Sequence, residues 1–201
     1  ATAMAFVDVL LSEHSNESLS IVMVDSRSEP GGHWNGAYPF VRLHQPACFY
    51  GVPSERLERE GETARFKYED LSSGSEVREY YRFLMDKYQK TGKVTYHSRC
   101  TYDFTADDGT FLSEQDGTTY KAEVRRKIVD STYTRVEIPS ERKPLFAIHP
   151  SVKCMPINGL AGVKLSDKRR QYVIMGAGKT GIDAVLYLLN GGVPQSDITW
   201  I

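Results

Sequence analysis

Apolar residues recur at helical spacing most clearly in one segment, residues 75–89. Five apolar or aromatic side chains stand there three, four or seven positions apart: Val77, Tyr80, Tyr81, Leu84 and Tyr88. This spacing puts them on one face of an α-helix, which Gly92 would end. Residues 1–11 are largely apolar without a helix breaker and predict a second helix. The aromatic face is better explained as core than as a ligand-binding surface.

Short apolar runs predict strands before and after the longer helix. They lie at residues 19–24, 93–100, 126–130 and 172–175. Their length and branched residues are typical of buried strands. Two dipeptides, Asp108-Gly109 and Asp116-Gly117, lie between shorter runs and favour tight hairpins. The alternation of helices and strands predicts an α/β fold, and the hairpins predict a small antiparallel β insertion within it.

A glycine motif follows the run at 172–175 directly. Gly176, Gly178 and Gly181 form the pattern G-x-G-x-x-G between this predicted strand and a helix. The apolar face predicted for that helix is Ile182, Val185, Leu186 and Leu189. In dinucleotide-binding folds the first glycine makes a tight turn, the second lets the backbone approach a pyrophosphate, and the third allows close packing of helix on strand. The context favours a nucleotide site over a plain glycine-rich turn. The candidate pyrophosphate-binding residues are Gly176, Gly178, Lys179, Thr180 and Gly181.

The dipeptide Lys179-Thr180 also suggests the phosphate loop of nucleotide triphosphatases. That motif requires a glycine five residues before the one that precedes the lysine. Val173 stands at that position, inside the predicted strand. The phosphate-loop interpretation is therefore excluded.

An acidic residue ends the first predicted strand. Asp25 follows the run at 19–24, and helix, strand and acid come in the order of the second half of a dinucleotide-binding βαβ unit, in which the acid binds a ribose hydroxyl. Pro30-Gly31-Gly32 then predicts a tight turn with exposed backbone N–H groups. The strand and glycine-rich turn of the first half are not present before Ala1, and the sequence stops inside a predicted strand at Ile201. We therefore expect a chain truncated at both ends.

Composition and charge disfavour several kinds of partner and site. Lysine and arginine number 25 against 26 aspartates and glutamates, a balance that argues against nucleic acid as a partner. No apolar run approaches membrane-spanning length, so we expect no membrane partner and a cytoplasmic location. Cys48, Cys100 and Cys154 lie far apart without a C-x-x-C pair, which suits a reducing compartment. The histidine spacing predicts no metal site.

Together these segments resemble the flavoproteins with two dinucleotide-binding domains, in particular the flavin-containing and Baeyer–Villiger monooxygenases. Gly31-Gly32-His33-Trp34 looks like the G-G-x-W turn of that family beside the flavin, and residues 129–133 resemble its A-T-G segment. The resemblance implies a Rossmann-like fold that binds FAD and NAD(P)H and passes a hydride from nicotinamide to flavin. It implies a partial FAD-binding domain at residues 1–138, a connecting segment at 139–168 and the start of an NAD(P)-binding domain at 169–201.

The resemblance also assigns residues to each cofactor. Asp25 would hold the FAD ribose, Cys100 would lie where the chain passes the adenine, and the glycine motif would hold NADPH or NADH. His33, His44 and Gln45 could approach the flavin ring, although each is better explained as a hydrogen-bonded polar residue than as a catalytic acid. The full set of FAD candidates is Asp25, Gly31, Gly32, His33, Trp34, Gln45, Cys100, Ser131 and Thr132.

The sequence departs from the family in three places. The first G-x-G-x-x-G is absent, Ser131-Thr132-Tyr133 replaces Ala-Thr-Gly, and the monooxygenase fingerprint F-x-G-x-x-x-H is not found at residues 146–149. No catalytic residue can be assigned. A small-molecule substrate and a homo-oligomer are consistent with the family. Two alternatives remain: a non-catalytic dinucleotide-binding module, and a flavin disulfide reductase, which the missing C-x-x-C disfavours.

Overall fold

A computed structural model of the chain describes residues 2–57, 71–132, 140, 142–165 and 171–201. The chain forms two compact units. The first comprises Ala1–Gly36 and Gln45–Tyr133, and the second comprises Ala37–His44 and Thr134–Ile201. The segment Ala37–His44 therefore belongs with residues far along the chain, which no pattern in the sequence predicts.

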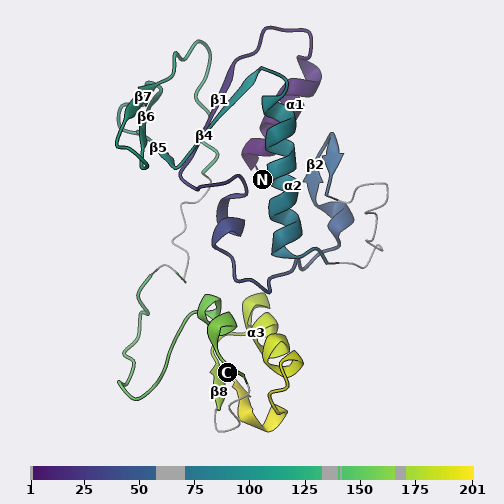
Figure 1. Ribbon diagram of the computed structural model, residues 1–201, viewed down its shortest axis with the longest axis vertical. Helices are drawn as coiled ribbons and strands as arrows, with labels where there is room; N and C mark the ends of the chain where they lie inside the picture. Colours follow the sequence, from purple (N-terminus) through teal and green to yellow (C-terminus); the bar gives the residue numbers. More distant parts are fainter. Residues whose placement is uncertain (1, 58–70, 133–139, 141, 166–170) are drawn as a thin grey trace. The chain divides into compact units, whose positions relative to one another are not determined.

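A parallel strand pair and two helices form the centre of the first unit (Figure 1). Strand β1 (Ile21–Asp25) pairs in parallel with β4 (Val94–Ser98), in a register that joins Asp25 to Ser98 at the strand ends. Helix α1 (Thr2–Glu13) precedes β1, and helix α2 (Gly74–Gln89) precedes β4 and packs on it. Both helices and β1 lie where the sequence predicts them, and β4 lies within the predicted run at 93–100.

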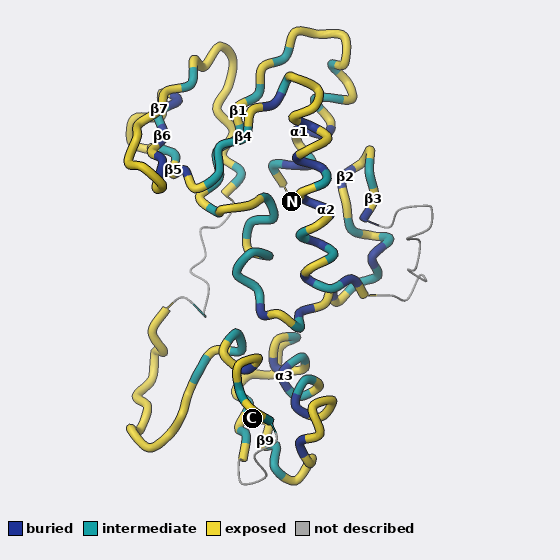
Figure 2. The backbone as a smooth tube through the Cα atoms, in the orientation of Figure 1, coloured by how far each residue is buried: buried dark blue, intermediate teal, exposed yellow. Residues whose placement is uncertain are grey.

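Helix α2 begins and packs as its sequence dictates. The Ser73 side chain accepts a hydrogen bond from the Glu76 backbone N–H while the Glu76 carboxylate accepts from the Ser73 N–H, a reciprocal cap of the first turn. The predicted apolar face is buried (Figure 2), with Val77, Tyr80, Tyr81, Leu84 and Tyr88 each at most 2% exposed. The aromatic stripe is therefore core.

Short elements fill the rest of the first unit. A 3₁₀ turn, η1 (Gly32–Gly36), follows β1, and η2 (Ala47–Phe49) precedes the small antiparallel pair β2 (Gly51–Val52) and β3 (Glu55–Arg56). The predicted hairpins form a three-stranded antiparallel sheet. Its strands are β5 (Cys100–Tyr102), β6 (Thr110–Ser113) and β7 (Thr119–Lys121), in that order.

The second unit contains a strand, a helix and a strand in succession. Strand β8 (Tyr172–Ile174) pairs in parallel with β9 (Ile198–Trp200), and helix α3 (Lys179–Asn190) connects them (Figure 1). Two 3₁₀ turns, η3 (Ile157–Gly162) and η4 (Gln195–Asp197), complete it. The buried centre of the unit is small and is formed by Leu160, Ala184, Leu188 and Val193.

Several details differ from the sequence predictions. The run at 126–130 is not a strand, because it pairs with no described segment, and Ile128 and Val129 are exposed. The strand predicted at 93–100 is interrupted at Arg99, whose φ of 52° redirects the backbone, so Cys100 begins β5 instead of ending β4. Strand β8 is only half-buried, because it has a single neighbour in the described sheet. Its Val173 side chain is exposed.

The buried face of α3 also differs from the prediction. The helix buries Gly181, Ala184 and Leu188, whereas Ile182 and Leu186 of the predicted apolar face are exposed. Apolar residues occur on both sides of this helix, so periodicity alone does not select the packed side. The side with the small residues packs, since glycine and alanine let the backbone approach its neighbours.

The described chain is thus mixed α/β with small sheets of two or three strands. Among its described residues, no helix has both the length and the apolar character needed to cross a membrane.

Candidate functional site

The turn between β8 and α3 is fixed by the strand that follows the helix. Gly176 adopts a φ of 109°, a conformation that favours glycine. Its N–H donates to the Ile201 carbonyl oxygen at 2.8 Å, and its carbonyl oxygen accepts from the Trp200 indole N–H at 2.8 Å. The first glycine of the motif therefore holds the turn against the end of β9.

Gly181 lets the helix begin close to this turn. A Cβ atom at position 181 would lie 2.3 Å from the Gly176 carbonyl oxygen, closer than any real contact allows. Gly181 is buried on the packed side of α3. The first and third glycines are thus required by the fold itself, as the motif predicts.

Gly178 differs from both, because nothing in the fold requires glycine there. It is the N-cap residue of α3 with an extended backbone, φ −80° and ψ 176°. Apart from the residue itself and its chain neighbours, no described atom lies within 4 Å of where its Cβ would stand. Helix N-caps favour serine, threonine, aspartate, asparagine and glycine, and of these only glycine offers no side chain to accept a hydrogen bond from the first turn. The helix begins without a side-chain cap. Gly178 leaves open space in front of backbone N–H groups that have no intrahelical partner, a geometry suited to an anion.

A charged cluster lies beside this helix start. The Lys179 ammonium forms an ion pair with the Asp183 carboxylate one turn along α3 and donates to the Arg42 carbonyl oxygen at 2.5 Å. The Tyr38 hydroxyl donates to the same Asp183 oxygen at 2.6 Å. Burial, and then this carboxylate, raise the pKa of Tyr38 well above its ordinary value, so its hydroxyl keeps its proton. Thr180, the next predicted residue of the site, is exposed.

Asp25 lies at the tip of β1, where the sequence predicts the ribose ligand. One carboxylate oxygen accepts from the Arg27 N–H at 2.9 Å, and the other accepts from the Tyr96 hydroxyl at 3.2 Å. A carboxylate has about four acceptor positions, so these two bonds leave capacity for hydroxyl donors. Burial and the charge of Asp25 raise the pKa of Tyr96, which keeps this hydroxyl a donor.

The turn after Asp25 leads to an aromatic chain of hydrogen bonds. Gly31 and Gly32 have φ values of 132° and 57°, and η1 follows at once. The Trp34 indole N–H donates to the Tyr50 hydroxyl at 2.9 Å, and the Tyr50 and Tyr81 hydroxyls are 2.9 Å apart. The bond between these two hydroxyls uses one of their two protons, so the second is available to a neighbouring group.

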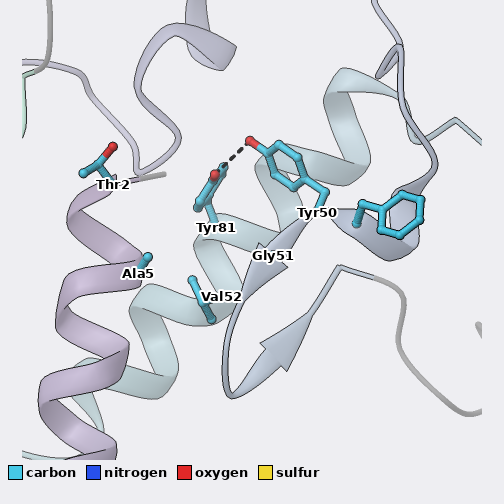
Figure 3. Close-up of a pocket in the computed structure, with 7 residues that line it drawn as sticks. Thr2, Ala5, Tyr50, Gly51, Val52 and Tyr81 are labelled. Atoms are coloured by element: carbon cyan, nitrogen blue, oxygen red, sulfur yellow. Dashed lines mark hydrogen bonds between the residues drawn. The ribbon is translucent and has the colours of Figure 1, made fainter.

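These two hydroxyls face a pocket at the start of α1. Figure 3 shows Tyr50 and Tyr81 joined by their hydrogen bond, with Ala5 of α1 and Val52 of β2 beside them. The pocket has a volume of about 250 Å³ and is lined by Thr2, Ala5, Phe49, Tyr50, Gly51, Val52 and Tyr81. Its walls are mainly apolar, and its lining residues with side-chain hydroxyls are Thr2, Tyr50 and Tyr81.

The other predicted FAD residues are scattered over the first unit. Cys100 is buried in β5, where burial raises the pKa of its thiol, and its sulfur lies 3.3 Å from the Ser98 carbonyl oxygen. Gln45 is half-buried just before η2. Desolvation of the His33 imidazole, and then nearby positive charge, lower the pKa of His33, so the neutral ring is favoured.

The predicted Ser131-Thr132 pair forms a local turn. The Asp130 carboxylate accepts from the Thr132 N–H at 2.9 Å and from its hydroxyl at 2.6 Å. Ser131 is half-buried and Thr132 is exposed. Tyr133, which completes the segment that resembles A-T-G, lies outside the described residues.

Sequence reasoning missed four residues that the structure brings to these sites. Tyr38 and Asp183 join Lys179 in the second unit, and Tyr50 and Tyr81 join Trp34 in the first. Of these four, only Asp183 could have been found from the sequence. It stands four residues after Lys179 on a predicted helix, and this spacing is typical of ion pairs. Tyr38 lies 145 residues before Asp183, and no local pattern predicts such a contact.

The described residues contain no cluster of three or more histidine, cysteine, aspartate or glutamate side chains placed to hold a metal ion. Cys48, Cys100 and Cys154 are free thiols.

Comparison with known proteins gives relatives without an assigned activity. No protein-family model matches the chain. It is 38% identical over 205 residues to uncharacterized protein Rv2000 of Mycobacterium tuberculosis and, equally, to uncharacterized protein Mb2023 of Mycobacterium bovis. Each match covers 100% of this chain and 36% of the relative, so the chain spans about a third of the length of these proteins.

Proposed function

We propose that this chain carries the nucleotide-binding parts of an FAD-dependent NAD(P)H oxidoreductase of the monooxygenase-like type, with Rossmann-like sites in both units. The observation that carries the proposal is Gly178. Its position has space for a capping side chain, yet the residue is glycine, which leaves the first turn of α3 without a side-chain cap. A backbone that must admit a pyrophosphate gives a physical reason for this choice.

The surrounding geometry supports a dinucleotide rather than a simple anion. The motif connects β8 to α3. Helix α3 then leads to β9, which pairs in parallel with β8. In such units a pyrophosphate sits on the helix N-terminus and the nucleoside extends over the strand ends. Gly176 and Gly181 bring the helix start close to the end of β8, and Gly178 keeps the approach open.

In the first unit, Asp25 supports the assignment of an FAD site. Its carboxylate lies at the end of a parallel strand, and two hydrogen bonds fix its orientation while acceptor capacity remains. The Gly31-Gly32 turn directs the chain into η1, where Trp34 joins Tyr50. These residues would hold the ribose and shape the flavin side of the site.

The chemistry would be that of the cofactors: bound NAD(P)H supplies a hydride and bound FAD accepts it. The residues of the chain bind and orient. Gly178 and the α3 N-terminus hold phosphate, Asp25 holds a ribose, and the neutral His33 ring is able to accept a hydrogen bond near the flavin. A small-molecule acceptor in the cytoplasm and a homo-oligomeric assembly fit this class of protein.

Anaerobic stopped-flow absorbance tests the proposal. The complete protein, loaded with FAD, is mixed with NADPH or NADH, and loss of flavin absorbance is followed. We expect one of the two nucleotides to bleach the flavin with saturation. Saturable binding of FAD and nucleotide without bleaching would support the non-catalytic binding module instead. Failure to bind either cofactor would contradict both interpretations.

A further inference from the structure

We propose that Lys179 acts on the bound dinucleotide through Asp183, as a positioning residue that neutralises this carboxylate, and not by contacting the phosphate itself. The proposal rests on the proposed nucleotide site at α3. It concerns a cluster of three side chains from two distant segments of the second unit: Tyr38, Lys179 and Asp183.

The Lys179 ammonium already has its partners. It contacts the Asp183 carboxylate and donates to the Arg42 carbonyl oxygen. Its side chain is 33% exposed, and that of Asp183 is 14% exposed. If the Lys179 ammonium turned toward a phosphate, it would lose both of these contacts. The Asp183 carboxylate would then be left without its cation and largely shielded from water.

Asp183 would otherwise oppose anion binding. It lies one turn into α3, close to the helix start at which a pyrophosphate would bind. Its charge has little access to water, and breaking a shielded ion pair leaves an uncompensated charge. With Lys179 in place the pair has no net charge, and the positive end of the helix and the free N–H groups attract the phosphate unopposed.

Tyr38 fixes the carboxylate in this arrangement. Its buried hydroxyl donates to the same Asp183 oxygen that contacts Lys179. The Lys179 ammonium also lies 5.9 Å from the centre of the Tyr38 ring. The aromatic residue therefore orients both members of the pair. Together with the stacking of Phe40 on Tyr187, these contacts join Ala37–His44 to the second unit.

A double-mutant cycle distinguishes this role from direct contact. Dissociation constants for NADPH and NADH are measured by calorimetry on the complete protein and on Lys179→Met, Asp183→Asn and the double variant. We expect Lys179→Met to weaken binding about tenfold or more, Asp183→Asn to bind at least as tightly as the parent, and the double variant to return within about threefold of it.

The other patterns overturn the proposal. If Lys179 contacts phosphate directly, the double variant binds as weakly as Lys179→Met. If the pair only supports the fold, Asp183→Asn and the double variant bind weakly as well, and their thermal midpoints fall in parallel. Asp183→Ala serves as a second neutral variant should Asp183→Asn fold poorly. A parent protein that binds neither nucleotide refutes the proposed site, and with it this role for Lys179.

Discussion

Gly181 and Gly176 approach so closely that a single methyl group at position 181 would lie 2.3 Å from the Gly176 carbonyl oxygen. This contact joins the start of α3 to the end of β8. We predict that Gly181→Ala lowers the free energy of unfolding by about 1–3 kcal/mol, since an added group must displace backbone. Urea denaturation of the parent and the variant measures this change in the free energy of unfolding. Gly162→Ala is the matched control, because its Cβ meets no atom within 4 Å. Equal effects of the two changes would contradict the predicted packing.

Alkaline pH is expected to destabilise the first unit. Burial raises the pKa of Tyr80 to about 12, and it raises the pKa values of Tyr81 and Tyr88 further. The fold favours the neutral phenols, so their contribution is complete below about pH 10, the ordinary value, and is lost as the pH rises toward 12.

Thermal unfolding across this pH window measures the effect. The midpoint should fall steeply between about pH 10 and about pH 12 as tyrosinate absorbance rises. Tyr120→Phe, a change at a ring that is 40% exposed, should leave the steep fall in place. A midpoint that stays level through the window would show that these phenols ionise without cost to the fold.

Asp25→Asn tests the FAD assignment. The amide keeps an acceptor for the Arg27 N–H but loses the charge that would strengthen a hydrogen bond from a ribose hydroxyl. We predict FAD binding about tenfold weaker or more, with NADPH binding retained, measured by fluorescence titration of the complete protein. Asp103→Asn is the control, because this carboxylate accepts backbone hydrogen bonds in an exposed turn. Unchanged FAD affinity in Asp25→Asn would remove Asp25 from the site.

Cysteine substitution separates direct hydride transfer from a disulfide mechanism. Cys48, Cys100 and Cys154 are free thiols that differ in burial. We predict that replacing each with alanine leaves NAD(P)H-driven flavin bleaching within about tenfold of the original rate, a barrier change of about 1.4 kcal/mol. Cys100→Ala should cost stability because the side chain is buried. Bleaching abolished by Cys48→Ala or Cys154→Ala alone, in a folded protein with FAD bound, would favour the disulfide reductase alternative.

Local patterns predicted most of the secondary structure. The helical spacing of Val77, Tyr80 and Tyr81 identified both α2 and its buried face, because one side of that helix is clearly polar. The same reasoning failed for α3, where apolar residues occur on both sides and the small residues decide the packing. It also failed at residues 126–130, since an apolar run forms a strand only where a neighbouring strand is available.

Only the parts of the candidate site that depend on neighbouring residues in the sequence could be predicted. Gly176 and Gly181 have the conformation and the close contact that the motif implies. The partners of Lys179 depend on a contact between segments 145 residues apart, and no periodicity contains that information. The proposal of a nucleotide site rests on the glycine motif and on the open space beside Gly178.

Gly178→Asp gives the most direct test of that proposal, because fold and function predict opposite effects. Aspartate is a favoured N-cap with space for its side chain, so the thermal midpoint should hold or rise. Its charge and bulk would occupy the phosphate position, so affinity for NADPH or NADH should fall at least about tenfold while FAD binding is retained. Gly178→Ser, which caps without charge, separates bulk from repulsion. Calorimetric titration of the complete protein that finds stable Gly178→Asp binding the nucleotide as tightly as the parent would contradict a dinucleotide site at α3.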